Sequence, residues 1–352
     1  MSDHRRRSGL YPAGLPAITV AVVIVADLLL TDTTVLGLVV AAPLLAANFS
    51  GPWATGGYGA LALATEALLG VADRVYVPGD RLVAQFIRMG SIASVSVLAV
   101  FLCRQRLARE QRLTQVTKVA EAAQRAILVP VPGRLGPARV AVHYESAASD
   151  ALIGGDMYAM VLTPHGLRVL VGDVRGKGLD AVRMSSQVLA AFRERAGDDA
   201  YLEVLLDHMD HTVARAAVND EEFVTAILIQ LTADGHVTLV GAGHPYPFTL
   251  SHGRARLLED PSPRPPLGLG GRAELTSLQL DPGDRLLLYT DGLTEARDPR
   301  TRAFLPDSTI LGALVADREP ADAVAALQHD VLQWSGGVLH DDIALVLIEY
   351  QP

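Results

Sequence analysis

The N-terminal part of the chain alternates between long apolar stretches and short polar breaks. The apolar stretches cover 13–30, 35–49, 54–72 and 84–103, and Asp, Thr, Gly, Pro and Arg gather between them. Each stretch approaches the ~20 residues that a helix needs to cross ~30 Å of hydrocarbon. A secretory signal peptide is the alternative for the first stretch, but the apolar pattern continues well beyond it. The pattern therefore predicts four transmembrane helices in residues 1–103, packed as a bundle.

Basic residues flank this region on both sides. Arg5, Arg6 and Arg7 precede the first stretch, and further arginines, beginning with Arg104, follow the last one. Because the cytoplasmic flanks of membrane segments are enriched in Arg and Lys, both ends are expected in the cytoplasm. The sequence therefore predicts a multi-pass protein of the cell membrane, with everything after residue 103 on the cytoplasmic side.

A helical pattern with a different periodicity follows over 104–128. Its apolar residues recur at alternating spacings of three and four, at Leu113, Val116, Ala120, Ala123 and Ile127. Such a seam is typical of a coiled coil, which would join two copies of the chain as a homodimer, and equally of an amphipathic helix packed on the next domain. Either interpretation predicts a linker helix between the membrane region and the rest of the chain.

From residue 129 onward the pattern changes to short β-prone runs separated by turns. The predicted strands cover 140–144, 157–163, 167–172, 224–231, 236–240, 285–290 and 343–349. Asp234-Gly235 stands between two of these runs as a hairpin turn, which favours antiparallel pairing. Helical periodicity appears at 179–196, 200–217 and 319–333, clustered rather than alternating regularly with strands. Residues 129–352 are therefore predicted to form an α+β domain and not a doubly wound sheet.

Composition and charge narrow the classes of function. Hydrophobic residues make up 50% of the chain, which agrees with a membrane region. The chain has a net charge of −9. Acidic and basic residues balance in 1–103, and basic residues are in excess in 104–128, so the excess of acidic residues lies in 129–352. A domain that is so acidic repels a phosphate backbone, which excludes nucleic acid as an expected partner. The single cysteine, Cys103, excludes a disulfide scaffold and a cysteine-based zinc site.

Four acidic residues stand at the ends of predicted strands. They are Asp156, Asp173, Asp291 and Asp341, and a glycine adjoins each of the first three. One acid at a strand end is most often a turn or cap residue. Four in one acidic domain favour a shared site, because clustered carboxylates repel one another unless cations neutralise them. Oxygen ligands without His or Cys select hard ions such as Mg²⁺ or Mn²⁺, and two such ions can activate water to hydrolyse a phosphate monoester.

Six motifs in this domain carry a family resemblance. They are GGDMY at 154–158, DVRGKG at 173–178, FVTA at 223–226, AGHP at 242–245, YTDGLTEA at 289–296 and DDIA at 341–344. In this order they resemble the SpoIIE-type branch of the metal-dependent PP2C-like (PPM) protein serine/threonine phosphatases, over about 125–350. The resemblance implies a β-sandwich flanked by α-helices, with two Mn²⁺ or Mg²⁺ ions at one edge. Nothing comparable covers the membrane region.

The resemblance also implies a set of metal ligands. They are the carboxylates of Asp156, Asp173, Asp291 and Asp341 and the backbone carbonyl of Val174. Asp342 is the alternative to Asp341, since the two acids stand in tandem. Many relatives carry an acid where this chain has Ala159, so an outer or third-metal ligand is in question while the two-metal core is complete.

Three other features of the motifs have competing interpretations. Gly154-Gly155-Asp156 also opens the signature of a diguanylate cyclase, but Met157 departs from its continuation. Lys177 stands in a glycine-rich segment that lacks the spacing of a phosphate-binding loop, so a solvated loop lysine is favoured over a phosphate ligand. His244 is either a proton donor to the leaving seryl oxygen or a structural turn residue, and its Gly and Pro neighbours favour the second.

These observations predict a membrane-anchored phosphatase that hydrolyses phosphoserine or phosphothreonine on a partner protein. By resemblance, the partner is a phosphorylated regulatory protein of the anti-anti-sigma type. The alternative from another class is a catalytically silent scaffold that uses the PP2C-like fold for signalling. The presence of all four strand-end acids favours the enzyme.

Overall fold

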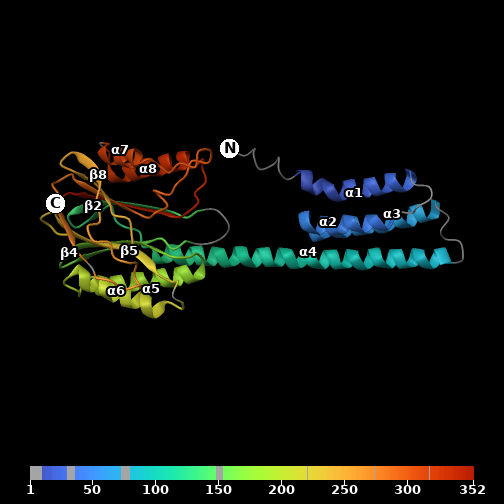
Figure 1. The fold of residues 1–352 in the computed structure, drawn as a ribbon, viewed down its shortest axis with the longest axis horizontal. Helices are drawn as coiled ribbons and strands as arrows, with labels where there is room; N and C mark the ends of the chain where they lie inside the picture. Colours follow the sequence, from blue (N-terminus) through green and yellow to red (C-terminus); the bar gives the residue numbers. More distant parts are fainter. Residues whose placement is uncertain are drawn as a thin grey trace. The chain divides into compact units, whose positions relative to one another are not determined.

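The protein has two compact units, Met1–Thr114 and Gln115–Pro352 (Figure 1). The computed structural model describes residues 10–29, 36–72, 80–147, 154–219, 221–272, 274–316 and 318–352. Arg5, Arg6 and Arg7, on which the predicted orientation of the N-terminus depends, lie outside the described residues.

The described part of the first unit is helical. Its elements are α1 (Leu10–Leu29), the 3₁₀ helix η1 (Leu36–Val40), α2 (Ala41–Phe49), α3 (Pro52–Ala72) and the beginning of α4 (Asp80–Ile127). One small buried cluster takes side chains from all of them, among them Val23, Val39, Ala42, Ala62 and Ile92. The predicted stretch 35–49 is divided between η1 and α2 and is not one helix. Pro43 stands in the first turn of α2, where its missing N–H is tolerated.

Helix α4 is continuous from Asp80 to Ile127. It therefore joins the fourth predicted apolar stretch and the predicted linker helix in one element. The sequence between them, at 101–111, contains neither Gly nor Pro and consists largely of good helix formers. The side chains of the 3-4-3-4 seam between 113 and 127 lie outside the described residues.

Among the described residues, one helix has both the length and the apolar character that a membrane span needs. It covers Leu82–Arg112, 31 residues, and its most apolar 18-residue window has a mean hydropathy of 2.0. Two further apolar helices, Gly14–Asp27 and Leu38–Phe49, are shorter than a span requires. The four-span bundle therefore stays a prediction.

Two antiparallel sheets form the centre of the second unit. The first sheet has the order β1 (Arg134–Leu135), β2 (Ala138–Glu145), β11 (Ile343–Tyr350), β10 (Arg285–Tyr289), β7 (Phe248–Ser251) and β8 (Arg254–Leu257). The second sheet has the order β3 (Met157–Thr163), β4 (Gly166–Val174), β5 (Val224–Leu231), β6 (His236–Ala242) and β9 (Thr276–Gln279). The Asp234-Gly235 turn joins β5 and β6 as an antiparallel hairpin, as its sequence predicts.

Helices cover one face of each sheet. Helices α5 (Leu179–Arg195) and α6 (Leu202–Ala216) pack on the second sheet, while α7 (Asp307–Val315) and α8 (Pro320–Trp334) pack on the first (Figure 1). The larger apolar core joins the two sheets with α5 and α6, and a smaller core lies between the first sheet, α7 and α8. This is the α+β sandwich flanked by helices that the sequence predicts.

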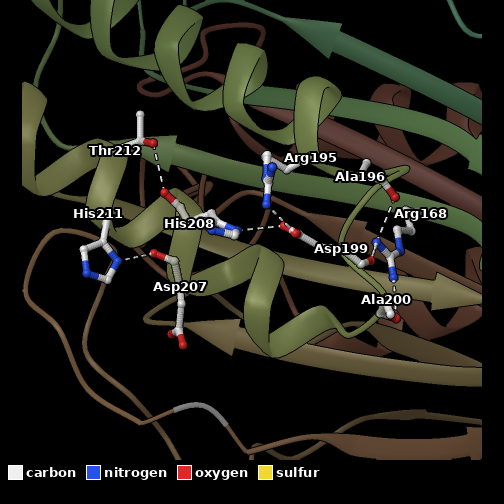
Figure 2. A network of polar contacts seen from close by, with 9 residues as sticks. All are labelled: Arg168, Arg195, Ala196, Asp199, Ala200, Asp207, His208, His211 and Thr212. Atoms are coloured by element: carbon white, nitrogen blue, oxygen red, sulfur yellow. Dashed lines mark hydrogen bonds and ion pairs between the residues drawn. The ribbon is translucent and has the colours of Figure 1, made fainter.

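A buried arginine ties α5 and α6 to the second sheet. Arg168 on β4 donates to the carbonyl oxygens of Ala196 and Ala200, at 2.8 and 3.0 Å, in the connection between the two helices (Figure 2). It also donates to the side-chain oxygen of Gln230, its cross-strand partner on β5. The carboxylate of Asp199 in the same connection accepts from Arg195 at 2.8 Å. Carbonyls beyond a helix C-terminus lack partners within the helix, and Arg168 satisfies them.

A second buried arginine has the same function in the first sheet. Arg285 on β10 lies opposite Glu349 on β11 and donates to its carboxylate at 2.8 Å. It also donates to the carbonyl oxygens of Leu314 at the end of α7 and of Ala316 and Arg318 in the connection to α8, at 3.2, 3.0 and 2.6 Å. In each sheet, one buried arginine therefore donates hydrogen bonds to the connection between the two helices that pack on that sheet.

The elements that the sequence does not predict are β1, β7, β8, β9 and α7. The four strands have at most four residues each and lie at or next to sheet edges. So few alternating positions do not establish a period of two. In α7 the two fully buried positions are Ile310 and Leu314, which is too little for a helical period.

Candidate metal centre

The register of the second sheet brings two predicted ligands together. Met157 at the start of β3 pairs with Gly172 on β4. Asp156, directly before β3, therefore stands beside Asp173, and the backbone carbonyl of Val174 follows at the end of β4. These three predicted ligands come from one edge of one antiparallel pair.

The first sheet brings the other two predicted ligands together in the same way. Tyr289 at the end of β10 pairs with Leu345 on β11. Asp291, two residues after Tyr289, therefore stands near the start of β11, which Asp341 precedes. The two sheets thus each contribute strand-end carboxylates.

A hydrogen bond across the sandwich joins the two groups into one centre. Thr290 Oγ1 donates to Asp156 Oδ2 at 2.6 Å, and the Ala344 N–H donates to Thr290 Oγ1 at 2.8 Å. Asp156 is only 3% exposed, so this contact fixes the orientation of a carboxyl group with little access to solvent. Thr290 therefore connects β3 to both β10 and β11.

The glycines of the GGD motif stand where the backbone lies very close to neighbouring residues. A Cβ atom on Gly155 would lie 2.3 Å from the carbonyl oxygen of Val174 and 2.7 Å from Asp173 Oδ1. A Cβ atom on Gly154 would lie 1.5 Å from Asp342 Oδ2, closer than any side chain permits. The two glycines of GGD therefore let the backbone pass directly between the carboxylates of the two sheets.

Burial and mutual repulsion raise the pKa values of these acids. The pKa of Asp156 lies well above its ordinary value of 3.8, first because the carboxyl group is buried and then because Asp173 is near. Burial, followed by the charges of Asp291 and Asp341, raises the pKa of Asp173 to about 7. Burial and the charge of Asp341 also raise the pKa of Asp291. The centre is thus deficient in positive charge, and a bound cation would favour its ionised form.

The tandem acids Asp341 and Asp342 have different environments. Asp342 is buried and accepts from Ser146 Oγ at 3.0 Å, the Ala147 N–H at 2.8 Å and the Tyr144 hydroxyl at 3.1 Å. Asp341 is about half exposed and forms an ion pair of 2.8 Å with Lys177. Protein donors therefore hold Asp342 in place, while Asp341 faces the other carboxylates and exchanges its partner more easily. This difference favours Asp341 as the ligand, which stays a prediction.

The donor set of this centre fits hard divalent cations. Carboxylate oxygens and one carbonyl oxygen are the ligands that Mn²⁺ and Mg²⁺ take in proteins. Two ions ~3.5–4 Å apart, as in two-metal hydrolases, would be shared among ligands from both sheets. Burial and mutual proximity raise the pKa values of Asp156, Asp173 and Asp291, and bound cations would lower these pKa values again.

A tighter acidic group lies elsewhere in the described residues. His252, Asp281 and Asp284 bring one ligand atom each within 4.8 Å of one another. However, Asp284 accepts from Ser251 Oγ and from the backbone N–H groups of His252 and Asp281, and His252 and Asp281 form a largely exposed ion pair. The group is therefore explained as the hydrogen-bonded contact between two turns, the one between β7 and β8 and the one before β10.

His244 is a structural residue in this arrangement. Its Nε2 lies 2.9 Å from the carbonyl oxygen of Tyr289, and its Nδ1 lies 3.0 Å from Thr225 Oγ1. Because a carbonyl only accepts, Nε2 carries the proton and Nδ1 accepts from the threonine hydroxyl. Burial lowers the pKa of His244 to about 4. The neutral imidazole therefore links β5 to β10, in agreement with the structural interpretation of its motif.

Sequence reasoning did not identify the residues that orient the carboxylates. Thr290 lies inside the YTDG motif directly before Asp291, so its position was a usable signal. Tyr144 and Ser146 gave none, because their contact with Asp342 arises only from the pairing of β2 with β11.

The fold and the centre define a class of protein, the PP2C-like domains. The SiaA-PP2C domain of Pseudomonas aeruginosa matches with a TM-score of 0.59 and 19% identity, over 69% of this chain and 99% of that domain. At this identity the match shows the fold alone. The RsbU and RsbW domains of Rv1364c from Mycobacterium tuberculosis match with a TM-score of 0.54 and 27% identity, over 63% of this chain and 64% of that one.

The chain belongs to the SpoIIE family. Residues 163–351 match the model of this family, described as Stage II sporulation protein E. The match includes Asp173, Val174, Asp291 and Asp341 and begins shortly after Asp156. Phosphoserine phosphatase RsbU of Bacillus subtilis (strain 168) is 24% identical over 202 residues, 56% of this chain and 59% of RsbU. The chain thus spans about three fifths of RsbU, and 36% of another curated relative that it matches.

Proposed function

We propose that this protein is a membrane-anchored, metal-dependent phosphatase that removes phosphate from phosphoserine or phosphothreonine of a partner protein. The observation that supports it best is the cluster of strand-end carboxylates whose pKa values rise through burial and mutual repulsion. Membership of the SpoIIE family and the similarity to a phosphoserine phosphatase support the same activity.

The residues proposed to hold the two ions are Asp156, Asp173, Asp291, Asp341 and the carbonyl of Val174. Bound Mn²⁺ or Mg²⁺ would supply an activated water molecule and charge neutralisation for the phosphoryl group. Thr290 orients the carboxylate of Asp156 by its hydrogen bond of 2.6 Å. Gly155 gives the carbonyl of Val174 the room that any larger residue would fill.

Two further residues position Asp341 in this proposal. Asp342 anchors the start of β11 through Ser146 and the backbone of Ala147. Lys177 holds the Asp341 carboxylate at 2.8 Å, and its ammonium group would turn toward the phosphoryl oxygens once Asp341 is engaged. An exposed lysine of this kind reorients at small cost, because exposed ion pairs contribute ~0–1 kcal/mol.

The proposed substrate is a phosphorylated regulatory protein of the anti-anti-sigma type. It is supported by the family resemblance and by the similarity to RsbU. The proposed location is the cell membrane, with four spans in residues 1–103 and residues 129–352 in the cytoplasm. The apolar helix Leu82–Arg112 supports this location, since only 22% of its most apolar window is buried within the protein.

Phosphate release by the purified full-length chain tests this function. We expect hydrolysis of an aryl phosphate and of phosphoserine peptides when Mn²⁺ is present, loss of both on chelation, and recovery when Mn²⁺ is restored. A catalytically silent scaffold would release no phosphate under any of these conditions, and that result would contradict the proposal.

A further inference from the structure

A cavity of about 350 Å³ adjoins the candidate metal centre. Asp341 of the centre and its neighbour Gly292 line the cavity, together with two arginines, Arg297 and Arg302. Its remaining charged lining residue besides Asp341 is Glu295. The cavity therefore lies where residues that flank a phosphorylated side chain would be placed.

The arginines stand on a tightly bonded hairpin at 296–305. Asp298 Oδ1 accepts from the backbone N–H groups of Arg300 and Thr301 at 2.8 and 2.6 Å. The N–H of Arg302 donates to the carbonyl of Asp298, and the N–H of Leu305 donates to the carbonyl of Ala296, both at 2.9 Å. Such a hairpin presents its side chains from a defined backbone and loses little entropy when it binds a partner.

The guanidinium groups on this hairpin differ from the buried arginines of the sheets. Arg297 lies over the ring of Phe304, 4.2 Å from its centroid. Arg302 is exposed and has a φ of 62°, a left-handed backbone conformation outside that of a regular strand. Within the described ranges, neither has a carboxylate partner, whereas Arg285 has Glu349. A stacked or exposed guanidinium group with free N–H donors is suited to bidentate pairing with a carboxylate.

We propose that this cavity binds an acidic side chain next to the phosphorylated residue of the substrate, with Arg302 and Arg297 as its partners. The inference rests on the proposed phosphatase activity and adds a specificity subsite to it. Once metal is bound at Asp341, the remaining acid of the cavity lining is Glu295, and the two arginines outweigh its charge. The cavity would therefore favour an acidic side chain over a neutral one.

The test compares two phosphoserine peptides on the full-length chain with Mn²⁺. One peptide has Glu and the other has Gln at all positions flanking the phosphoserine, and an aryl phosphate serves as a substrate without flanking residues. We expect kcat/KM to be about tenfold higher for the Glu peptide, and Arg302→Ala to remove most of this preference while aryl phosphate turnover stays unchanged. Ala has the same backbone cost as Arg at this φ, so the fold of the hairpin is preserved.

Arg300→Ala is the matched control, because Arg300 is an exposed arginine of the same hairpin that does not line the cavity. It should keep the preference for Glu. Equal kcat/KM for the two peptides, or an unaltered preference in Arg302→Ala, would overturn the inference while leaving the phosphatase activity in place. Absence of turnover of all three substrates by the unaltered chain would overturn the proposed function, and the subsite with it.

Discussion

At the residue scale, the carboxylates of the candidate centre differ in their surroundings. Asp156 accepts from Thr290, Asp341 pairs with Lys177, and Asp173 lies among other acids. Only one of these partners carries a positive charge. Without metal, the carboxylates of the folded chain therefore repel one another. This repulsion lowers the free energy of unfolding of the metal-free protein.

Asp173→Asn tests this repulsion directly. Ionisation of Asp173 is disfavoured in the folded state, where its pKa is about 7, relative to its ordinary value of 3.8. The ionised carboxylate therefore destabilises the fold above about pH 4, and the neutral amide does not. In metal-free buffer at pH 8 we expect a melting temperature a few degrees higher for Asp173→Asn, measured by thermal unfolding.

The control for this measurement is Asp281→Asn, which alters an acid in the exposed pair with His252. It should leave the melting temperature nearly unchanged, since exposed pairs contribute little. A lower melting temperature for Asp173→Asn than for the unaltered chain would show that the carboxylate is not under repulsion.

His244 gives a pH dependence of the opposite sign. The ordinary pKa of histidine is 6.5, and burial lowers that of His244 to about 4. Between these values the unfolded chain binds a proton that the folded chain does not, so stability falls as the pH falls from 6.5 to 4, by up to ~3 kcal/mol. Urea unfolding at a series of pH values should show this slope reduced in His244→Gln.

His236→Gln is the matched control, because His236 is an exposed histidine on β6. It should keep the slope of the unaltered chain. If His244→Gln also kept the full slope, the buried neutral imidazole would not be its source.

The motifs of the sequence predict the acids of the candidate centre, but not the side chains that hydrogen-bond to them. The acids and glycines of the motifs lie within short segments, so their types and spacing are visible in the chain. The choice between Asp341 and Asp342 depends on Ser146 and Ala147, which are distant in sequence and become neighbours only through the β2–β11 pairing. Contacts of that kind have no local signal.

At the element scale, the two buried arginines have equivalent positions. Arg168 and Arg285 each lie on a strand, face a polar cross-strand partner and bind the carbonyls of a helical connection. In the sequence Arg168 lies in an apolar β run and is indistinguishable from an exposed strand position. Periodicity predicts the positions of most helices and strands. It does not predict the hydrogen bonds between these arginines and the carbonyls of the helix connections.

Arg168→Leu should destabilise the second unit strongly. It leaves the buried carbonyl oxygens of Ala196 and Asp199 without their arginine donor, and each such acceptor costs ~1–3 kcal/mol. We expect a loss of about 3 kcal/mol or more in the free energy of unfolding, measured by urea denaturation. Arg254→Leu, an exposed arginine on the edge strand β8, should change it by less than ~1 kcal/mol. Equal effects of the two variants would contradict the anchoring role.

Helix α4 is one element where the sequence predicts two, a membrane span and a linker helix. Its apolar first part and polar second part differ in composition, so they are predicted separately, yet nothing between them ends a helix. The continuous helix is a suitable frame for the predicted linker. Whether two copies pair along it as a homodimer stays a prediction of the seam between 113 and 127.

At the scale of the whole molecule, the arginine clusters predict the topology. With an even number of spans between Arg7 and Arg104, the N-terminus and the second unit share the cytoplasmic side. Reporter fusions at residue 3 and at residue 128 should therefore both report a cytoplasmic location. An external location for either fusion would mean that the number of spans is odd or that the region does not cross the membrane as predicted.

In the proposed function, the strand-end carboxylates hold the metals of a phosphatase. The most direct measurement is Mn²⁺-dependent phosphate release from a phosphoserine protein by the full-length chain, by Asp173→Asn and by Asp281→Asn. We expect turnover by the unaltered chain and by Asp281→Asn, and a loss of at least about a hundredfold in Asp173→Asn, since a proposed ligand of the metal pair is removed. Full Mn²⁺-dependent turnover by Asp173→Asn would contradict this proposal.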